Sequence, residues 1–212
     1  MANFFSASQE EQQEILLNFW QTYKYLLIVG LMLIVLVIVG RDYYQSASLE
    51  KNLDSATQYQ EYIEAENDQS AIGDDILQSY PATIYSDFVL LNEAKKNYLQ
   101  GQSNIAIDLL KSVIENKQLD SNEFDPILAT AQTRLAKIYL EQKNYDEVLN
   151  IFESNGDMTS SMHELNGDAH NGLNQFNMAR MSFMLALQSS TNQTARALIN
   201  MKISDLESEE VE

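Results

Sequence analysis

An uncharged apolar run near the N-terminus constrains this chain more than any other feature of its sequence. Residues Tyr25 to Gly40 read YLLIVGLMLIVLVIVG, sixteen residues without a charged side chain. As a helix they would be about 24 Å long, slightly short of the ~30 Å core of a bilayer. Aromatic and basic residues extend the run at both ends and suit the two membrane interfaces. These residues are Phe19, Trp20, Tyr23, Lys24, Arg41, Tyr43 and Tyr44. The sequence therefore predicts a transmembrane helix at 19–44.

Two other interpretations of this run fit less well. A cleaved signal peptide would begin with a short basic segment, but 24 residues containing Glu10, Glu11 and Glu14 precede the run. A buried core helix would carry charges on at least one face, and this run has none. One Lys precedes the uncharged run and one Arg follows it, so the charge count leaves the orientation open.

The composition excludes several classes of function. Asp and Glu number 31 and Lys and Arg number 13, which gives a net charge of −18. Nucleic-acid binding is not expected, because it needs a basic surface. Cysteine is absent, which removes disulfides, thiolate nucleophiles and cysteine-ligated metal sites. Only seven Gly and two Pro interrupt 212 residues, so long helices are favoured over a many-turned β fold.

The rest of the chain has helical periodicity and no strand-like alternation. A helix after the span is expected to bury the apolar set Leu49, Leu53, Ala56, Tyr59 and Ile63, with Glu50, Lys51, Asp54 and Glu61 outside. Asp125 followed by Pro126 is typical of a helix N-cap and first helical position. Asn155-Gly156-Asp157 indicates a turn.

An internal repeat in the sequence indicates how these helices pack together. Small residues at Ala94, Ala136 and Gly167 each belong to a pattern of small and large residues typical of tetratricopeptide helix pairs. They are separated by 42 and 31 residues, against an expected period of about 34. An insertion around Gln118–Asp125 and a shortened helix near Ile151–Gly156 would explain the difference. The predicted fold class is all-α: a single N-terminal transmembrane helix followed by a tetratricopeptide-like helical-repeat superhelix. The alternative is an irregular helical bundle.

Stacked helix pairs form a concave face lined by the first helix of each pair, and such faces bind protein segments. The predicted partner-binding residues on this face are Leu91, Lys95, Tyr98, Lys137, Leu140, Glu164, Asp168 and Asn171. For each, the alternative is an ordinary solvated helix residue. Met178, Met181 and Met184 could form an adaptable binding stripe, although Met at this spacing more commonly belongs to a core.

No motif for catalysis, cofactor binding or metal binding is found in the sequence. His163 and His170 lie seven residues apart near Glu164 and Asp168, but the spacing lacks a His-x-x-x-His pair and a structural role is expected. Acidic pairs such as Asp74-Asp75, and the acids Asp120, Glu123 and Asp125, are expected by chance in so acidic a chain. The expectation is a protein that is not an enzyme and has no cofactor. The acidic C-terminus is expected to be a solvated tail.

The order of these features resembles a known family. A short acidic N-terminus precedes one membrane helix ending in Gly40-Arg41-x-Tyr43-Tyr44, and helix pairs follow. Leu165-Asn166-Gly167-Asp168-Ala169 precedes the last pair, and the chain closes with Met201-Lys202-Ile203-x-x-Leu206. Over about residues 15–207 the chain resembles the YfgM-type ancillary subunits of the bacterial Sec translocon, which are inner-membrane proteins.

The resemblance implies a membrane topology and a set of partners, neither of which the composition indicates. It implies a short acidic cytoplasmic segment at 1–18, the membrane helix at 19–44, a periplasmic tetratricopeptide-like repeat domain at 45–207 and an acidic tail at 208–212. The implied partners are the SecYEG translocon, a membrane-anchored periplasmic chaperone of the peptidyl-prolyl isomerase type, a response regulator and membrane lipid. The implied role is non-catalytic: the repeat domain assists handover of translocated proteins to periplasmic chaperones. The alternative is a membrane-anchored helical-repeat scaffold for envelope assembly or stress signalling that is not tied to the translocon.

Overall fold

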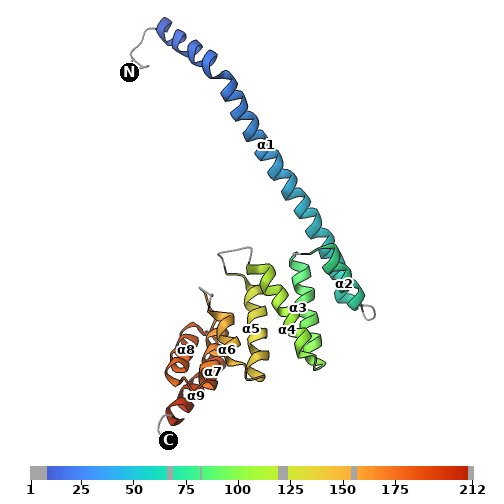
Figure 1. The fold of residues 1–212 in the computed structure, drawn as a ribbon, viewed down its shortest axis with the longest axis vertical. Coiled ribbons are helices and arrows are strands. Elements are labelled where there is room, and N and C mark those ends of the chain that lie inside the picture. The colour runs from blue at the N-terminus through green and yellow to red at the C-terminus, as the bar shows by residue number, and fades with distance from the viewer. Residues whose placement is uncertain (1–8, 66–68, 82, 119–123, 154–156, 210–212) are drawn as a thin grey trace. The chain divides into compact units, whose positions relative to one another are not determined.

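Helices make up nearly all of the chain that the structure describes (Figure 1). The computed structural model describes residues 9–65, 69–81, 83–118, 124–153 and 157–209. The helices are α1 (Gln9–Glu64), α2 (Gln69–Ser79), α3 (Ile84–Leu99), α4 (Ser103–Gln118), α5 (Pro126–Glu141), α6 (Tyr145–Phe152), α7 (Ser160–Gly172), α8 (Phe176–Ser189) and α9 (Gln193–Glu209). The chain divides into two compact units, Met1–Asp54 and Ser55–Glu212.

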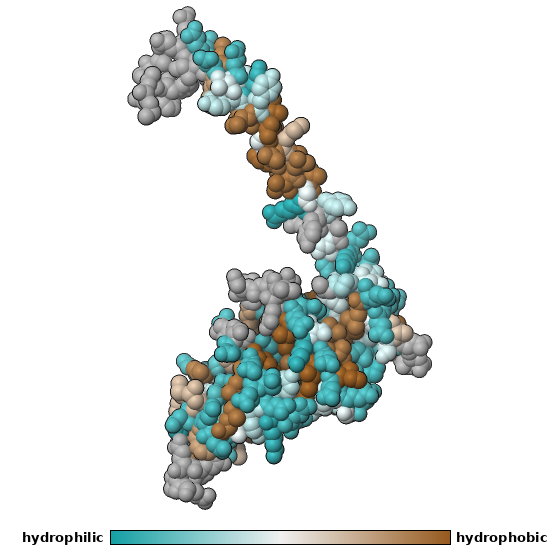
Figure 2. Space-filling view, in the orientation of Figure 1, coloured by the Kyte–Doolittle hydropathy of each residue, from teal (hydrophilic) through white to brown (hydrophobic). Residues whose placement is uncertain are grey.

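The first unit consists of the N-terminal part of α1. Residues Leu17–Arg41 form a candidate membrane span of 25 residues with a mean hydropathy of 2.4, and none of it is covered by protein. A helix of this length extends about 38 Å, which is enough to cross a ~30 Å hydrocarbon core. Figure 2 shows the span as a continuous band of hydrophobic surface. An apolar helix without protein cover, whose backbone hydrogen bonds are all internal, suits a lipid environment.

The sequence predicted the buried face of the last part of α1 only in part. Ala56 and Tyr59 are half-buried, and Tyr59 packs against the cluster around Tyr62. Ile63 was expected inside but is exposed, and the fully buried side chains are Ser55 and Tyr62. Tyr62 lies against Gly73 of α2, and its hydroxyl donates to Glu93 Oε1 of α3 at 3.0 Å. The buried stripe is therefore set by these partners on α2 and α3. Leu49 and Leu53, also expected inside, are exposed in the first unit.

The second unit continues with three helix pairs, α3/α4, α5/α6 and α7/α8, followed by α9. The first helix of each pair begins at a side-chain cap, which satisfies backbone N–H groups that have no partner inside the helix. Thr83 forms a reciprocal capping box with Ser86 before α3, and Thr159 accepts from Met162 N before α7. Asp125 accepts from two backbone N–H groups at the start of α5, and Pro126 follows it, as predicted.

The turn inside each pair has the same backbone geometry, which demonstrates the repeat. Gly101, Lys143 and Asn174 all have a positive φ, of 79°, 59° and 58°. The residue after each donates its N–H to a carbonyl five residues back at 2.9 Å, which is the Schellman arrangement that ends a helix. These turns are 42 and 31 residues apart, matching the spacing of the predicted small residues. The predicted tetratricopeptide-like fold is therefore confirmed.

The predicted irregularities of the repeat are partly visible. The shortened second helix is present, because α6 contains only eight residues. Residues 119–123 of the proposed insertion and Asn155-Gly156 of the predicted turn lie outside the described residues. So do residues 1–8 of the N-terminal segment and 210–212 of the tail.

Small residues allow the helices of a pair to approach closely, as the pattern predicted. Ala94, Ala136 and Gly167 are all buried. A Cβ added to Gly167 would lie 2.5 Å from Cε1 of Phe183 on α8, so only glycine fits at this crossing. One apolar core runs from α3 to α7, and a second cluster around Phe183, Ile199 and Leu206 joins α8 to α9.

Candidate partner-binding surface

The predicted concave-face residues lie on the first helices α3, α5 and α7, but they differ in exposure. Lys95 and Lys137 are exposed, whereas Leu91 is buried in the core. The other predicted residues are half-buried: Tyr98, Leu140, Glu164, Asp168 and Asn171. The two lysines are therefore the members of this set that are fully available to a partner, and the use of the face for binding stays a prediction.

Side-chain hydrogen bonds connect α3 and α5, the first helices of the first two pairs. Arg134 Nη1 of α5 donates to the Leu91 carbonyl of α3 at 2.9 Å. The Tyr98 hydroxyl donates to the Glu141 carboxylate of α5, with oxygen separations of 2.6 and 2.7 Å. This carboxylate raises the pKa of Tyr98, because a hydrogen bond to a negative acceptor favours the protonated phenol. Tyr98 therefore connects two repeats.

Two predicted binding residues, Glu164 and Asp168, are engaged within the chain. Lys202 Nζ of α9 lies 2.8 Å from Glu164 Oε1 and 2.7 Å from both Asp168 oxygens. Its ammonium also lies 5.6 Å from the Phe183 ring centroid. Burial alone would lower the pKa of Lys202, but the hydrogen bonds and charges of the two carboxylates raise it above its ordinary value. Burial raises the pKa of Asp168, and Lys202 opposes that rise. We call Lys202, Glu164 and Asp168 the α9 clasp.

The methionines of α8 are exposed, so the expectation that they belong to the core is wrong. Met178, Met181 and Met184 are about half exposed or more, and Leu185 beside them is exposed as well. The opposite face of α8 is the buried one, with Ala179 and Phe183 among its core residues. These four exposed side chains are called the α8 stripe below: Met178, Met181, Met184 and Leu185.

A buried charge network was not foreseen from the sequence. Asp87 of α3 is almost fully buried, and its Oδ2 lies 3.1 Å from Lys117 Nζ of α4. Lys117 also lies 3.6 Å from Oδ2 of Asp125, the N-cap of α5. Burial raises the pKa of Asp87, while Lys117 acts against the rise. The network connects three helices, and the only sequence signal for it was an acidic residue on an otherwise apolar face.

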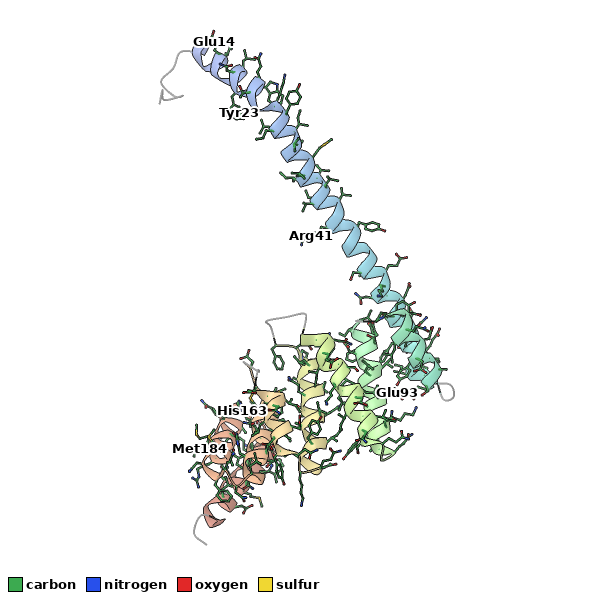
Figure 3. The ribbon with its side chains drawn as sticks, viewed as in Figure 1. Glu14, Tyr23, Arg41, Glu93, His163 and Met184 are labelled. Carbon is green, nitrogen blue, oxygen red and sulfur yellow. The ribbon has the colours of Figure 1, made fainter. Side chains whose placement is uncertain are left out.

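The histidines and acidic residues singled out in the sequence are dispersed over the part of the chain that the structure describes. Within them no group of three or more His, Asp or Glu could hold a metal. His163 is half-buried on α7, and burial lowers its pKa, while His170 Nδ1 lies 2.7 Å from Gln175 Oε1. Figure 3 shows His163 and Glu93 on different repeats. Asp74 and Asp75 are exposed on α2, Asp125 is a helix cap, and Asp120 and Glu123 lie outside the described residues.

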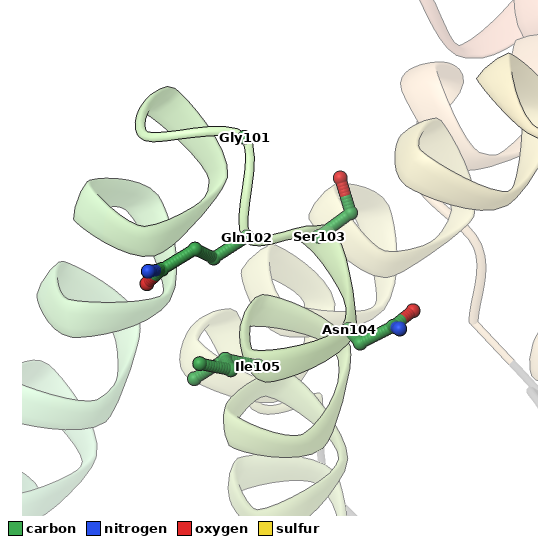
Figure 4. A pocket seen from close by; sticks show the side chains of 5 residues that line it. All are labelled: Gly101, Gln102, Ser103, Asn104 and Ile105. Atoms are coloured by element: carbon green, nitrogen blue, oxygen red, sulfur yellow. The ribbon is translucent and has the colours of Figure 1, made fainter.

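A surface hollow of about 360 Å³ lies at the turn between α3 and α4 (Figure 4). It is lined by Gly101, Gln102, Ser103, Asn104 and Ile105. These residues form a helix-to-helix turn without a charged side chain, so the hollow follows from the turn geometry.

Comparisons with known proteins agree with this architecture. The chain is 29% identical over 212 residues to the "Ancillary SecYEG translocon subunit" of Neisseria gonorrhoeae, covering 95% of this chain and 99% of the relative. The resemblance expected from the sequence is thereby confirmed. No solved structure matches the chain. A family model described as "Tetratricopeptide repeat-like domain" matches residues 18–208, from the membrane span to the last helix. The chain therefore belongs to the tetratricopeptide repeat-like domain family.

Proposed function

We propose that this protein is a non-catalytic, membrane-anchored adaptor of the Sec translocon. The observation that carries the proposal is the similarity, over nearly the full length of both chains, to a protein named as an ancillary SecYEG translocon subunit. The architecture supports it, since a candidate membrane span is followed by helical repeats, which usually bind protein partners.

The mechanism would be local concentration. An anchor beside the channel keeps the repeat domain near emerging chains, so that weak contacts act as intramolecular ones. In the proposed topology the N-terminus is cytoplasmic and the repeat domain is periplasmic. The net charge of −18 would repel anionic lipid head groups and favour contact with proteins over contact with the membrane surface.

The finer partners form the second part of the proposal. The repeat domain would pass translocated proteins to periplasmic chaperones, including a membrane-anchored one of the peptidyl-prolyl isomerase type. A response regulator would contact the cytoplasmic side. The exposed lysines Lys95 and Lys137 are the predicted face residues available for these contacts on the repeat domain. The proposed partners are supported by the family resemblance, and the proposed contact residues by the exposure of these two side chains.

Topology and co-purification test the proposal together. Because the chain has no cysteine, a Gln142→Cys variant provides one label site at an exposed position after α5. Intact cells and lysed cells are each treated with a membrane-impermeant maleimide. In parallel, membranes are dissolved in mild detergent, the tagged full chain is purified, and the purified sample is probed for channel subunits. The expected result is labelling in intact cells and co-purification of the channel.

Each part of the result has a distinct meaning. Protection of the cysteine until lysis would place the repeats in the cytoplasm and rule out periplasmic handover. Labelling of intact cells without channel co-purification would favour the alternative, a scaffold for envelope assembly or stress signalling. A control chain with a foreign membrane span in place of residues 17–41 shows whether the natural span contributes to channel association.

A further inference from the structure

Methionine supplies all the sulfur in this chain, because cysteine is absent. Outside the candidate span, the described methionines fall into two classes. Met162 is 1% exposed in the core, and Met158 is half-buried against that core. The exposed class consists of the three methionines of the α8 stripe together with Met201 of α9. Among the described residues that follow the span, the exposed thioethers therefore all lie between 178 and 201.

The three methionines of the α8 stripe lie side by side on a face that water reaches. They follow one another at intervals of three residues, which places their Cβ atoms about 5–6 Å apart. Met178, Met181 and Met184 are 49%, 61% and 53% exposed. Asn177 and Gln188 are exposed on the same side of the helix, so polar groups keep this face hydrated. Figure 3 shows Met184 at the outer edge of the repeat unit.

The packing of α8 does not depend on these thioethers. Its buried face consists of Ala179, Ser182, Phe183 and Ala186, and the apolar members of this set form a core cluster with side chains of α9. A polar oxygen added to a core methionine would lie among apolar groups and destabilise the fold. An oxygen added on the outer face of α8 would instead be solvated. This helix is therefore able to carry oxidised methionine without repacking.

We propose that the outer face of α8 is a site of reversible oxidation by hydrogen peroxide, at which Met178, Met181 and Met184 become sulfoxides while the repeat fold persists. Each sulfur attacks one oxygen of the peroxide and the O–O bond breaks. That oxygen stays on the sulfur and the other leaves as water, so the sulfur loses two electrons and the peroxide gains them. A methionine sulfoxide reductase reverses the step with two thiols, which become a disulfide as the oxygen leaves as water.

Oxidation at this site changes the chemistry of the surface. A thioether is apolar and polarisable, whereas a sulfoxide is polar and accepts hydrogen bonds. Three sulfoxides beside Asn177 and Gln188 would turn a mixed face into a polar one, with Leu185 as its remaining apolar side chain. This role goes beyond the proposed adaptor function and does not depend on association with the translocon.

The rate of oxidation is measured at each methionine of the full chain in nanodiscs of zwitterionic lipid. The chain is incubated with excess hydrogen peroxide, samples are quenched at intervals and digested, and the sulfoxide fraction of each methionine is measured by mass spectrometry. The same chain unfolded in urea gives the unprotected rate at each position. We expect Met178, Met181 and Met184 to react within about threefold of their unprotected rates, and Met162 to react at least about tenfold more slowly than its own.

Variants that mimic the sulfoxide test whether the fold tolerates it. The triple variant Met178→Gln, Met181→Gln, Met184→Gln places polar groups of similar length on the outer face and should keep the urea midpoint of the parent chain. The matched variant Met162→Gln should lower the midpoint, because it buries a polar amide in the core. Chain in which α8 is oxidised and Met162 is not should also unfold at the parent midpoint. Methionine sulfoxide reductases with a dithiol should return it to its starting mass.

Each part of the proposal has a result that would overturn it. Protection of the α8 methionines equal to that of Met162 would show that peroxide does not reach this face. A lower urea midpoint of the oxidised chain, or of the triple variant, would show that α8 needs its thioethers for packing. Sulfoxides that resist the reductases on the folded chain would rule out reversibility. Because these measurements use the purified chain alone, their failure is distinguishable from a failure to co-purify the channel.

Discussion

Glycine at position 167 gives the sharpest test of the helix packing in this domain. Helix propensity alone predicts that Gly167→Ala would stabilise α7 by about 1 kcal/mol. The structure predicts the opposite sign. The added Cβ would lie 2.5, 2.6 and 3.0 Å from three ring carbons of Phe183, where ordinary carbon contacts are about 3.5–4.0 Å.

The net effect follows from the two opposing terms. Phe183 is 1% exposed, so its ring can move only by displacing other core residues. Overpacking of a well-packed core costs about 1–3 kcal/mol, and three overlapping ring carbons place this site at the upper end. After the helix-propensity gain is subtracted, Gly167→Ala should lower the free energy of unfolding by about 2 kcal/mol. The assay is urea unfolding of the full chain in mild detergent, followed by far-ultraviolet circular dichroism.

A second variant shows whether the Phe183 ring is the cause. In a Phe183→Leu background the clash is relieved, so Gly167→Ala should become neutral or stabilising. The coupling between the two changes is read from a double-mutant cycle. A higher urea midpoint for Gly167→Ala, or an equal cost in both backgrounds, would contradict a clash with the Phe183 ring.

Three further changes test the turns, the clasp and the cap. Lys143 has a φ of 59°, a conformation that costs a side chain about 1–2 kcal/mol, while glycine adds about 0.4–1 kcal/mol of unfolded-state entropy. Lys143→Gly should therefore raise stability by about 0.5–1 kcal/mol in the same urea assay, and a loss would contradict the turn assignment. Lys202→Met should lower the free energy of unfolding by about 1–2 kcal/mol at neutral pH and by less in acid. Without the ammonium, the pKa of Asp168, which burial already raises, rises further. The Asp168 carboxyl is then protonated as the pH falls, and its buried charge is lost. Because the two carboxylates raise the pKa of Lys202 above its ordinary value of 10.5, its ion pairs stabilise the folded chain below that pH. This stabilisation is lost as the pH rises through the folded-state pKa of Lys202. Unfolding curves across the pH range would show the loss. Asp125→Ala should cost about 1–2 kcal/mol through loss of the cap and of the Lys117 contact, and Asp125→Asn, which keeps a capping oxygen, should cost less in thermal unfolding.

Local and periodic features were predictable from the sequence. The uncharged run at 25–40 identified the candidate span, because length and apolarity alone decide whether a helix can cross a bilayer. The spacing of Ala94, Ala136 and Gly167 predicted the repeat register, since each helix pair reuses the same close approach. The cap at Asp125 was predictable because its hydrogen bonds reach only two and three residues along the chain.

Tertiary structure alone decided which residues of the candidate site are exposed to a partner. Glu164 and Asp168 were predicted on the open face, yet Lys202, more than thirty residues later, reaches both. The methionines of α8 have the spacing of a core stripe, and the structure buries the other side of the helix around Phe183 instead. A periodic pattern shows which residues share a face of a helix. Only the meeting of elements distant in sequence decides whether that face is covered, because burial depends on which helix packs there.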